Sequence, residues 1–381
     1  MAVYLDNNAT TALDAEVLDS MLPYMGQVTG NPSSVHRFGR LQRDAIEQAR
    51  DTVARLVGAR AEQVVFTSGG TESNNLLLRG FGNTDKQAQI TVSAIEHLSL
   101  LEPAQHLAHA VSEIAVDENG VVLLSALEQA ITDNTRLISV MAANNETGVL
   151  QNLKPLIAFA EDRGCYFHSD ASQAAGKIPL NFVESGLHAM TLSAHKLYGP
   201  IGVGALVLDK RMPMTKLQYG GVQEKNLRAG TENVPAIVGF GKAAELALTN
   251  MRVRAAHTRN LRDELETGLK MIEAVTIFSE SVERLPNTVQ FGVDGFDGET
   301  LLMQLDRKAI AVSSGSACTS GKTEPSHVLK AMQVPNNLAN SAVRVSFGKN
   351  NGMSDVDALL SALQDIITIN RQSSVMMAAT I

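Results

Sequence analysis

The alternation of short β-branched runs with helical stretches constrains the fold of this chain more than any other feature. Apolar runs of strand length recur between segments whose apolar residues are spaced as on one face of a helix. The strand-like runs cover residues 64–67, 89–94, 137–142, 165–168 and 203–208, and the helical segments cover residues 40–57, 71–82 and 154–162. This order predicts a mostly parallel sheet covered by helices.

A second, smaller lobe is expected towards the C-terminus. The chain has 381 residues, which is more than a single core usually holds. Residues 233–271 show a continuous helical pattern, which we interpret as the link between two lobes. Short strands are predicted after it at 288–291, 310–313 and 343–347, mixed with helices at 298–307, 325–331 and 355–367. This mixture indicates a compact α+β lobe.

Composition and charge favour a small-molecule substrate. Hydrophobic residues make up 44% of the chain and charged residues 19%, as in folded globular proteins. The net charge of -8, without any dense Lys/Arg run, argues against binding nucleic acid or a membrane surface. The N-terminus lacks signal-peptide features and no run is long and apolar enough to span a bilayer, so we expect a cytoplasmic protein. The two cysteines, Cys165 and Cys318, suit a reducing compartment and are too few for a cysteine-rich metal site.

Lys196 stands alone in an uncharged run. Between Glu184 and Asp209 the chain holds no Asp, Glu or Arg and no other Lys. An apolar setting lowers the pKa of an amine, and a neutral lysine amine is the nucleophile that forms Schiff bases. The alternative is a lysine with a buried stem and a charged head in solvent. The stretch alone does not decide between the two.

Two predicted strand ends carry groups that suit a phosphorylated cofactor. Ser68-Gly69-Gly70 follows a strand and precedes a helix, an arrangement that offers backbone amides to a phosphate, although a plain turn is the alternative. Asp170 ends the strand of "CYFHSD", with Gln173 just beyond it. An Asp there can pair with the protonated ring nitrogen of pyridoxal phosphate, or it can simply cap a helix.

Four further residues have both a functional and an ordinary interpretation. His97 suits stacking on a flat ring and proton exchange, or is a core or cap histidine. Arg344 suits a carboxylate clamp, or is a solvated residue of an edge strand. Cys318, in "SSGSACTSG", suits an accessible, reactive thiol, or is an incidental surface cysteine. Cys165 begins an apolar strand and is interpreted as an inert core residue.

Together these residues describe a pyridoxal phosphate site, and the chain resembles the cysteine desulfurases, in the class V aminotransferase-like branch of fold-type I pyridoxal phosphate enzymes. The similarity runs through "YLDNNATT", "GNPSSVHRFG", "FTSGGTESNN", "ANNETG", "HSDASQAAGK", "SAHKLYGPIGVGAL", "RAGTEN", "SSGSACTSG" and "EPSHVLKAM". It implies a large α/β domain over residues 15–255, with a mostly parallel seven-stranded sheet between helices. Residues 1–14 and 256–381 would form a smaller α+β domain that carries Cys318 and Arg344.

The resemblance also implies a role for each candidate residue. Lys196 would hold pyridoxal 5'-phosphate through a Schiff base, His97 would stack on the ring and shuttle protons, and Cys318 would be the nucleophile. The cofactor's ring nitrogen and hydroxyl would bind Asp170 and Gln173. Its phosphate would be held by Gly70, Thr71, Ser193 and His195, joined by Thr231 from the second subunit of a homodimer. The substrate amino acid would bind Asn145 and Arg344, with Arg344 taking its carboxylate.

The implied reaction converts L-cysteine to L-alanine. The Cys318 thiolate would attack the sulfur of L-cysteine and keep it as a persulfide for a sulfur-acceptor protein that serves iron–sulfur cluster assembly, tRNA thiolation or another sulfur modification. A selenocysteine lyase or another lyase of the same fold is the nearest alternative, and a non-catalytic scaffold is an alternative of another class. One departure stands out: Lys225 and Asn226 occupy positions where the family usually has Arg-Gly.

Overall fold

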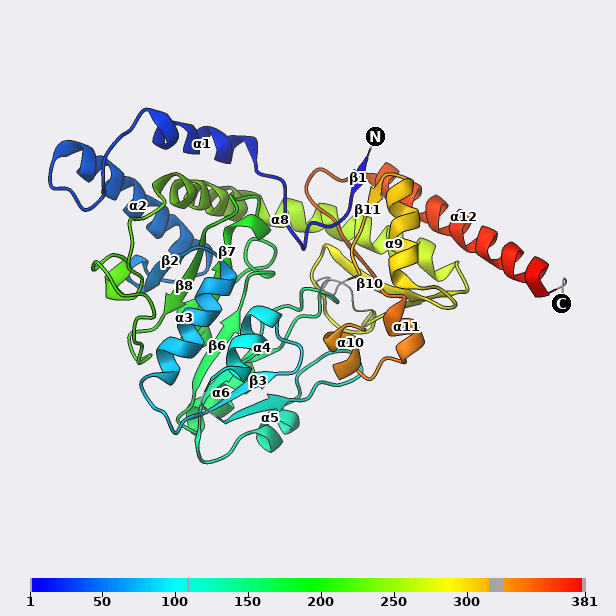
Figure 1. The fold of residues 1–381 in the computed structure, drawn as a ribbon, viewed down its shortest axis with the longest axis horizontal. Helices are drawn as coiled ribbons and strands as arrows, with labels where there is room; N and C mark the ends of the chain where they lie inside the picture. The colour runs from blue at the N-terminus through cyan, green and yellow to red at the C-terminus, as the bar shows by residue number, and fades with distance from the viewer. Residues whose placement is uncertain (1, 108–109, 315–324, 379–381) are drawn as a thin grey trace.

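A seven-stranded sheet forms the centre of the larger part of the molecule in the computed structural model, which describes residues 2–107, 110–314 and 325–378 (Figure 1). In spatial order its strands are β2 (Val64–Thr67), β8 (Gly204–Leu208), β7 (Ala189–Ser193), β6 (Tyr166–Asp170), β5 (Thr135–Ser139), β3 (Gln89–Ser93) and β4 (Val111–Ile114). Strands β4, β3, β5, β6 and β7 run parallel, and β8 is antiparallel to both of its neighbours. The predicted α/β fold with a mostly parallel sheet is confirmed.

Alternate residues of each strand feed two separate cores, one on each face of the sheet. Phe66 and Val207 belong to the core beneath α1 (Ala15–Gly26), α2 (Arg37–Leu56) and α8 (Val234–Lys270). Their neighbours Val65 and Leu206 belong to the opposite core, under α3 (Gly70–Gly82) and α4 (Leu98–Gln105). This division follows from the period of two in a β-strand.

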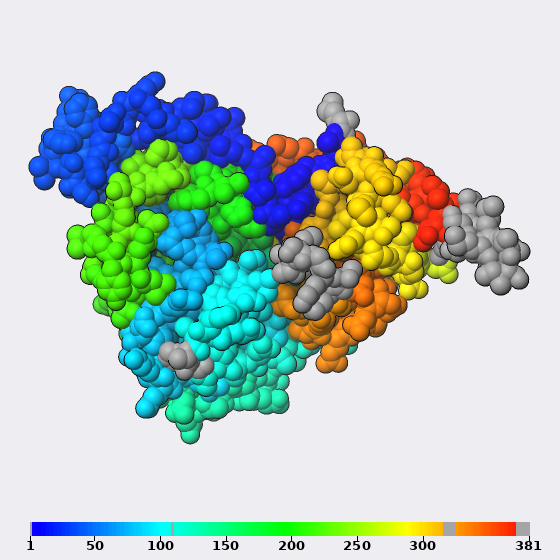
Figure 2. All heavy atoms as spheres, viewed as in Figure 1, coloured from blue at the N-terminus to red at the C-terminus, as the bar shows by residue number. Residues whose placement is uncertain are grey.

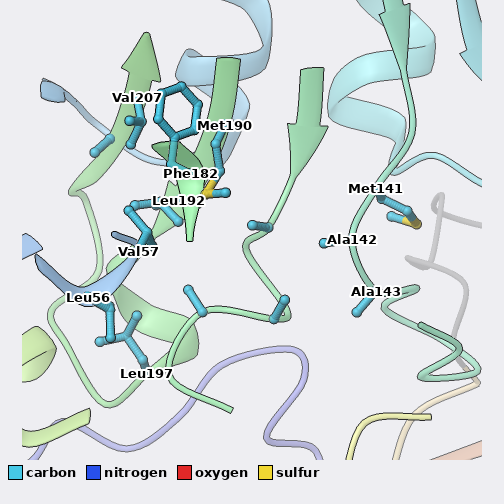
Figure 3. Packing of buried hydrophobic residues seen from close by; sticks show 14 of the residues in the cluster. Leu56, Val57, Met141, Ala142, Ala143, Phe182, Met190, Leu192, Leu197 and Val207 are labelled. Atoms are coloured by element: carbon cyan, nitrogen blue, oxygen red, sulfur yellow. The ribbon is translucent and has the colours of Figure 1, made fainter. Parts of the chain in front are cut away.

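The first of these cores is extended by shorter elements around the sheet. They are the helices α5 (Leu124–Ala130), α6 (Leu153–Asp162) and α7 (Phe182–Ser185). The 3-10 turn η1 (Ala61–Gln63) directly precedes β2. Figure 3 shows Phe182 of α7 with Met190 and Val207 of the sheet and Val57, which follows α2. Side chains from the apolar runs that predicted buried strands therefore pack in one continuous core.

Helix α8 joins the sheet to a second lobe, as the helical pattern over residues 233–271 predicted. Its N-terminal half packs Ile237 and Phe240 into the sheet core, and its C-terminal half packs Leu261 and Leu265 into a separate core. Figure 1 shows the helix running from one part of the molecule into the other.

The C-terminal lobe contains a three-stranded antiparallel sheet in the order β12 (Val343–Ser346), β10 (Thr288–Val293), β9 (Val275–Ile277). Its helices are α9 (Gly298–Arg307), α10 (His327–Ala331), α11 (Asn336–Asn340) and α12 (Met353–Ala378). The N-terminal strand β1 (Val3–Tyr4) pairs in parallel with β11 (Ile310–Ala311), so the start of the chain lies against this lobe (Figure 2). The domain boundaries expected from the sequence stay a prediction.

No helix in the described part of the chain is both long and apolar enough to cross a membrane.

Candidate active site

A cavity of about 1010 Å³ lies where the carboxyl ends of the sheet strands meet the C-terminal lobe. This edge is where open α/β sheets usually bind ligands. The cavity brings together most of the residues predicted from the sequence: Gly70, Thr71, His97, Asn145, Asp170, Gln173, Ser193, His195, Lys196 and Arg344. Cys318 lies outside the described residues, but Ser314 and Pro325, on either side of that segment, line the cavity.

Lys196 projects into this cavity from a 3-10 turn, η2 (Ala194–Lys196), that directly follows β7. Its Nζ donates hydrogen bonds to the backbone oxygens of Asn8 (2.6 Å) and Ala9 (2.8 Å). Burial lowers the pKa of Lys196 to about 8, and the positive charge of Arg344 acts in the same direction. The amine is therefore easily deprotonated, as a Schiff-base lysine requires.

Asp170 and His97 belong to one hydrogen-bond network. Asn74 Nδ2 donates to Asp170 Oδ2 and to Ser99 Oγ, at 2.9 Å each. Asp170 Oδ1 also accepts from the amide of Ser172 (2.9 Å). His97 is the N-cap of α4, as the cap interpretation expected, and it also lines the cavity. Its stacking on a ring stays a prediction.

The protonation of His97 is set by its cap contact. Its Nδ1 accepts from the Ser99 amide at 3.1 Å, and an amide can only donate. Burial lowers the pKa of His97, which favours the neutral ring. A neutral imidazole carries one proton, so that proton lies on Nε2.

The start of α3 forms a cradle for an anion. Its N-cap, Gly69, provides no side-chain acceptor for the first-turn amides. The hydroxyl of Ser172 is buried without a partner among the described residues, and a Cβ placed on Gly70 would lie 3.2 Å from it. Gly204 is required by the close approach of this turn, because its Cβ would lie 2.7 Å from Gly69 Cα. The cradle therefore combines free donors with space, as a phosphate requires.

Ser193 and His195 line the same cavity beside Lys196. His195 Nδ1 lies 3.1 Å from Thr10 Oγ1. Burial, and then the charge of Lys196, lower the pKa of His195 to about 4. Because the His195 ring is neutral at pH 7, positive charge in this part of the cavity comes from Lys196 and Arg344.

The N-terminal segment supplies a residue that sequence reasoning missed. The backbone oxygen of Asn8 accepts from Lys196 and from Gln173 Nε2 (2.9 Å), and its side-chain oxygen accepts from Lys177 Nζ (3.0 Å). Lys177 also donates to Gln173 Oε1 (2.9 Å), and burial holds the pKa of Lys177 well below its usual value. Only the polar run "DNNATT" signals this role in the sequence.

Arg344 is buried, so the interpretation as a solvated edge residue is wrong. Its Nη2 lies 2.6 Å from Asp6 Oδ1, and its Nη1 donates to the backbone oxygen of Asn145 (3.1 Å). Its Nε has no partner among the described residues. The guanidinium is thus held in place at the cavity with donor capacity left for a carboxylate.

The Lys225-Asn226 departure falls in a strained turn, η3 (Glu224–Asn226). Glu224, Lys225 and Asn226 have φ of 41°, 59° and 62°, in the left-handed region, where asparagine is better tolerated than most non-glycine residues. A buried pair anchors the turn: both carboxylate oxygens of Glu224 accept from Arg50, at 2.7 and 2.8 Å.

Thr231 does not line the cavity that contains Lys196. It is exposed, and it borders a separate hollow of about 380 Å³ beside Tyr24 and Val234. Thr231 therefore does not contribute to the cavity of its own subunit.

Cys165 is buried, and its Sγ donates to the backbone oxygen of Thr135 at 3.2 Å. Burial raises the pKa of its thiol. The prediction of a core cysteine is confirmed.

Comparisons with known proteins agree with this arrangement. The sequence pattern of the family described as Aminotransferase class-V matches residues 3–359. The chain is 42% identical over 374 residues to the cysteine desulfurase IscS of Dictyoglomus turgidum, covering 96% of this chain and 94% of that protein. A solved NifS-like protein is 35% identical with a TM-score of 0.91, covering 97% of this chain and all of the other. A structure titled "SspA in complex with cysteine" is 28% identical with a TM-score of 0.81, covering 91% of this chain and 99% of the other. The chain therefore belongs to the cysteine desulfurases of the class-V aminotransferase family.

Proposed function

We propose that this chain is a pyridoxal 5'-phosphate-dependent enzyme that converts L-cysteine to L-alanine and takes the sulfur onto Cys318 as a persulfide. Enzymes of its family depend on this cofactor in general. The observation that carries the proposal is that one cavity is lined by Lys196, Asp170 and the anion cradle at the start of α3. The pKa of Lys196 is lowered to about 8 there.

The residues that would hold the cofactor fit its three polar parts. Its phosphate would lie at the start of α3, on Gly70, Thr71, Ser193 and His195, with Ser172 as a further donor. Asp170 would pair with the ring nitrogen, Gln173 with the ring hydroxyl, and His97 would lie against the ring. When bound, pyridoxal phosphate supplies a carbonyl that captures amines and a ring that withdraws electrons from the substrate.

The chain's own groups then prepare the substrate. The pKa of Lys196 is lowered to about 8, which makes its amine far easier to free than that of an ordinary lysine. Arg344, held by Asp6, has Nε available for the substrate carboxylate, and Asn145 lies beside it. His97 presents its Nε2 proton, because Nδ1 is occupied by the Ser99 amide.

The assembly and the destination of the sulfur belong to the same proposal. We propose a homodimer in which Thr231, exposed on one subunit, reaches the phosphate of the other. The persulfide sulfur would pass to an acceptor protein, and the low cysteine content suits a reducing, cytoplasmic location. The protein titled SspA, which is similar in fold, binds cysteine, and this supports L-cysteine as the substrate.

The test measures L-alanine formed from L-cysteine with a reductant present. The Cys318→Ser variant is expected to retain the cofactor absorbance but to form no alanine, whereas Cys165→Ser serves as the matched control and is expected to remain active. Undiminished activity in Cys318→Ser would refute the persulfide route. Alanine from L-selenocysteine but not from L-cysteine would identify a selenocysteine lyase instead.

A further inference from the structure

His327 lines the cavity, and none of the roles above uses it. It is the first residue of α10. Its Nε2 lies 2.9 Å from the backbone oxygen of Glu96. A carbonyl oxygen only accepts, so Nε2 carries the proton, and in the neutral ring Nδ1 holds a free lone pair. Nδ1 has no hydrogen-bond partner among the described residues.

Two of the three histidines that line the cavity, His97 and His327, therefore have opposite tautomers when neutral. His97 uses Nδ1 to accept from the Ser99 amide and presents an N–H, whereas His327 uses Nε2 to donate and presents a bare nitrogen. Both tautomers are set by backbone groups around the start of α4, the oxygen of Glu96 and the amide of Ser99. This pair thus provides one proton donor and one proton acceptor of the same chemical type.

The orientation of His327 is fixed from both sides. Glu96 is fully buried, and its Oε1 accepts from Ser93 Oγ (2.7 Å) and the Met141 amide (2.6 Å), which holds the turn in place. On the other side, Ser326 Oγ donates to Glu146 Oε2 at 2.5 Å and caps α10. The ring of His327 lies between these two anchors.

A base is needed when the substrate enters. An amino acid arrives with an ammonium group, which must lose a proton before its nitrogen can act as a nucleophile. The other groups that face the cavity are engaged or weakly basic: His97 presents a proton, His195 contacts Thr10 through Nδ1 and has a pKa lowered to about 4, and Asp170 has two donors. The remaining charged groups of the lining are Glu102, Glu146, Lys196, Asp297, Glu299 and Arg344.

We propose that His327 is the general base for substrate entry, with Nδ1 accepting a proton from the α-ammonium of bound L-cysteine. An N–H bond of the substrate breaks and leaves its electron pair on the substrate nitrogen, while an N–H bond forms on the imidazole. The imidazolium returns the proton to water in the open cavity, and no oxidant or reductant takes part. This inference rests on the proposed function, since it requires an amino acid substrate.

The test follows the absorbance of the bound cofactor in the holoenzyme after rapid mixing with L-alanine, which has the same ammonium group but no thiol. The variant is His327→Gln, whose amide still donates to the Glu96 oxygen but is not basic. At pH 7 the rate of the absorbance change is expected to fall by about 10²-fold or more. At pH 10, where much of the free amine is already neutral, the variant is expected to be within a few-fold of the parent.

A matched control and a rescue separate the base from a structural role. His257→Gln removes an exposed histidine whose Nε2 also contacts a backbone oxygen, that of Asn351 at 2.9 Å, and is expected to change nothing. Added imidazole is expected to restore the pH 7 rate of His327→Ala.

Three results would overturn the role of His327 while leaving the proposed function in place. An equal loss at both pH values indicates a structural residue, and a loss with L-cysteine but not with L-alanine indicates that His327 serves the thiol. An unchanged rate in the variant excludes the role altogether. A parent enzyme without any absorbance change overturns the proposed function itself, and the role of His327 with it.

Discussion

Replacing Glu224 by alanine is expected to cost about 3 kcal/mol of the free energy of unfolding, because it leaves the Arg50 guanidinium buried without its main countercharge. The side chains of Arg50 and Glu224 are 6% and 2% exposed. The substitution removes two Arg–carboxylate hydrogen bonds, and it also frees the Phe66 amide, which donates to Glu224 Oε2 at 2.7 Å.

Arg50 keeps part of its environment, which places the cost at the lower end of the usual range of about 3–5 kcal/mol for broken buried pairs. Its Nη1 still donates to the Val64 oxygen at 3.0 Å, and its guanidinium lies 4.8 Å from the centre of the Phe66 ring. Glu47 remains a partner at 3.1 Å, but its side chain is 58% exposed and is screened by solvent.

The assay is urea unfolding followed by far-UV circular dichroism, because the chain contains no tryptophan for fluorescence. The double variant Arg50→Met/Glu224→Leu removes both charges and is expected to lie within about 1 kcal/mol of the parent. Glu47→Ala is the matched control for an exposed partner and is expected to cost less than about 1 kcal/mol. A Glu224→Ala cost no larger than that of Glu47→Ala, or a double variant as unstable as the sum of the single ones, would refute this account of the pair.

Three further outcomes follow from the geometry. Ser172→Ala is expected to weaken pyridoxal phosphate binding about tenfold in equilibrium titration, as the loss of one hydrogen bond implies, whereas Ser169→Ala, whose buried hydroxyl does not line the cavity, is not. Since the pKa of Lys196 is lowered to about 8, cofactor capture by the apo-protein should quicken about tenfold per pH unit below 8 and level off above it, and a rate independent of pH between 6 and 9 would contradict a titrating amine. Asn226→Gly is expected to raise the free energy of unfolding by up to about 1 kcal/mol by removing left-handed strain at φ 62°, and a clear loss of stability would show that the contact from Lys216 Nζ to Asn226 Oδ1 matters more.

Strong local patterns predicted most of the larger sheet and its long helix. The runs at 64–67 and 203–208 correspond to β2 and β8, and the pattern over 233–271 corresponds to α8. Strand β4 was missed because its sequence, VSEI, is short and only partly buried, so it shows no continuous apolar run. Strand β7 was missed because it lies in the same uncharged run as Lys196, where strand and turn have similar composition.

The residues of the candidate site also fall into two groups: some are predictable from the local sequence, and others are placed by contacts with distant parts of the chain. Asp170 was predictable because it ends a strand, and topology brings the carboxyl ends of parallel strands to one edge. Lys196 was predictable because it stands alone in an uncharged run. Asn8 was not predictable, since contacts with distant parts of the chain place it beside Lys196: β1 pairs with β11, and the Asn8 amide donates to Ser346 Oγ. Ser172 lies within the motif "HSDASQAAGK". Only the structure shows that its hydroxyl has no partner among the described residues and borders Gly70.

His327 marks the physical limit of reasoning from residue types and spacing. Its tautomer depends on the backbone oxygen of Glu96, which lies 231 residues earlier in the chain. Every residue has a backbone carbonyl, so no side-chain pattern signals this contact. The turn from Glu96 into the start of α4 also fixes the tautomer of His97, through the Ser99 amide. A substitution that displaces this turn, such as replacement of the buried Glu96, is therefore expected to alter the proton chemistry of both histidines together, although neither ring has been changed.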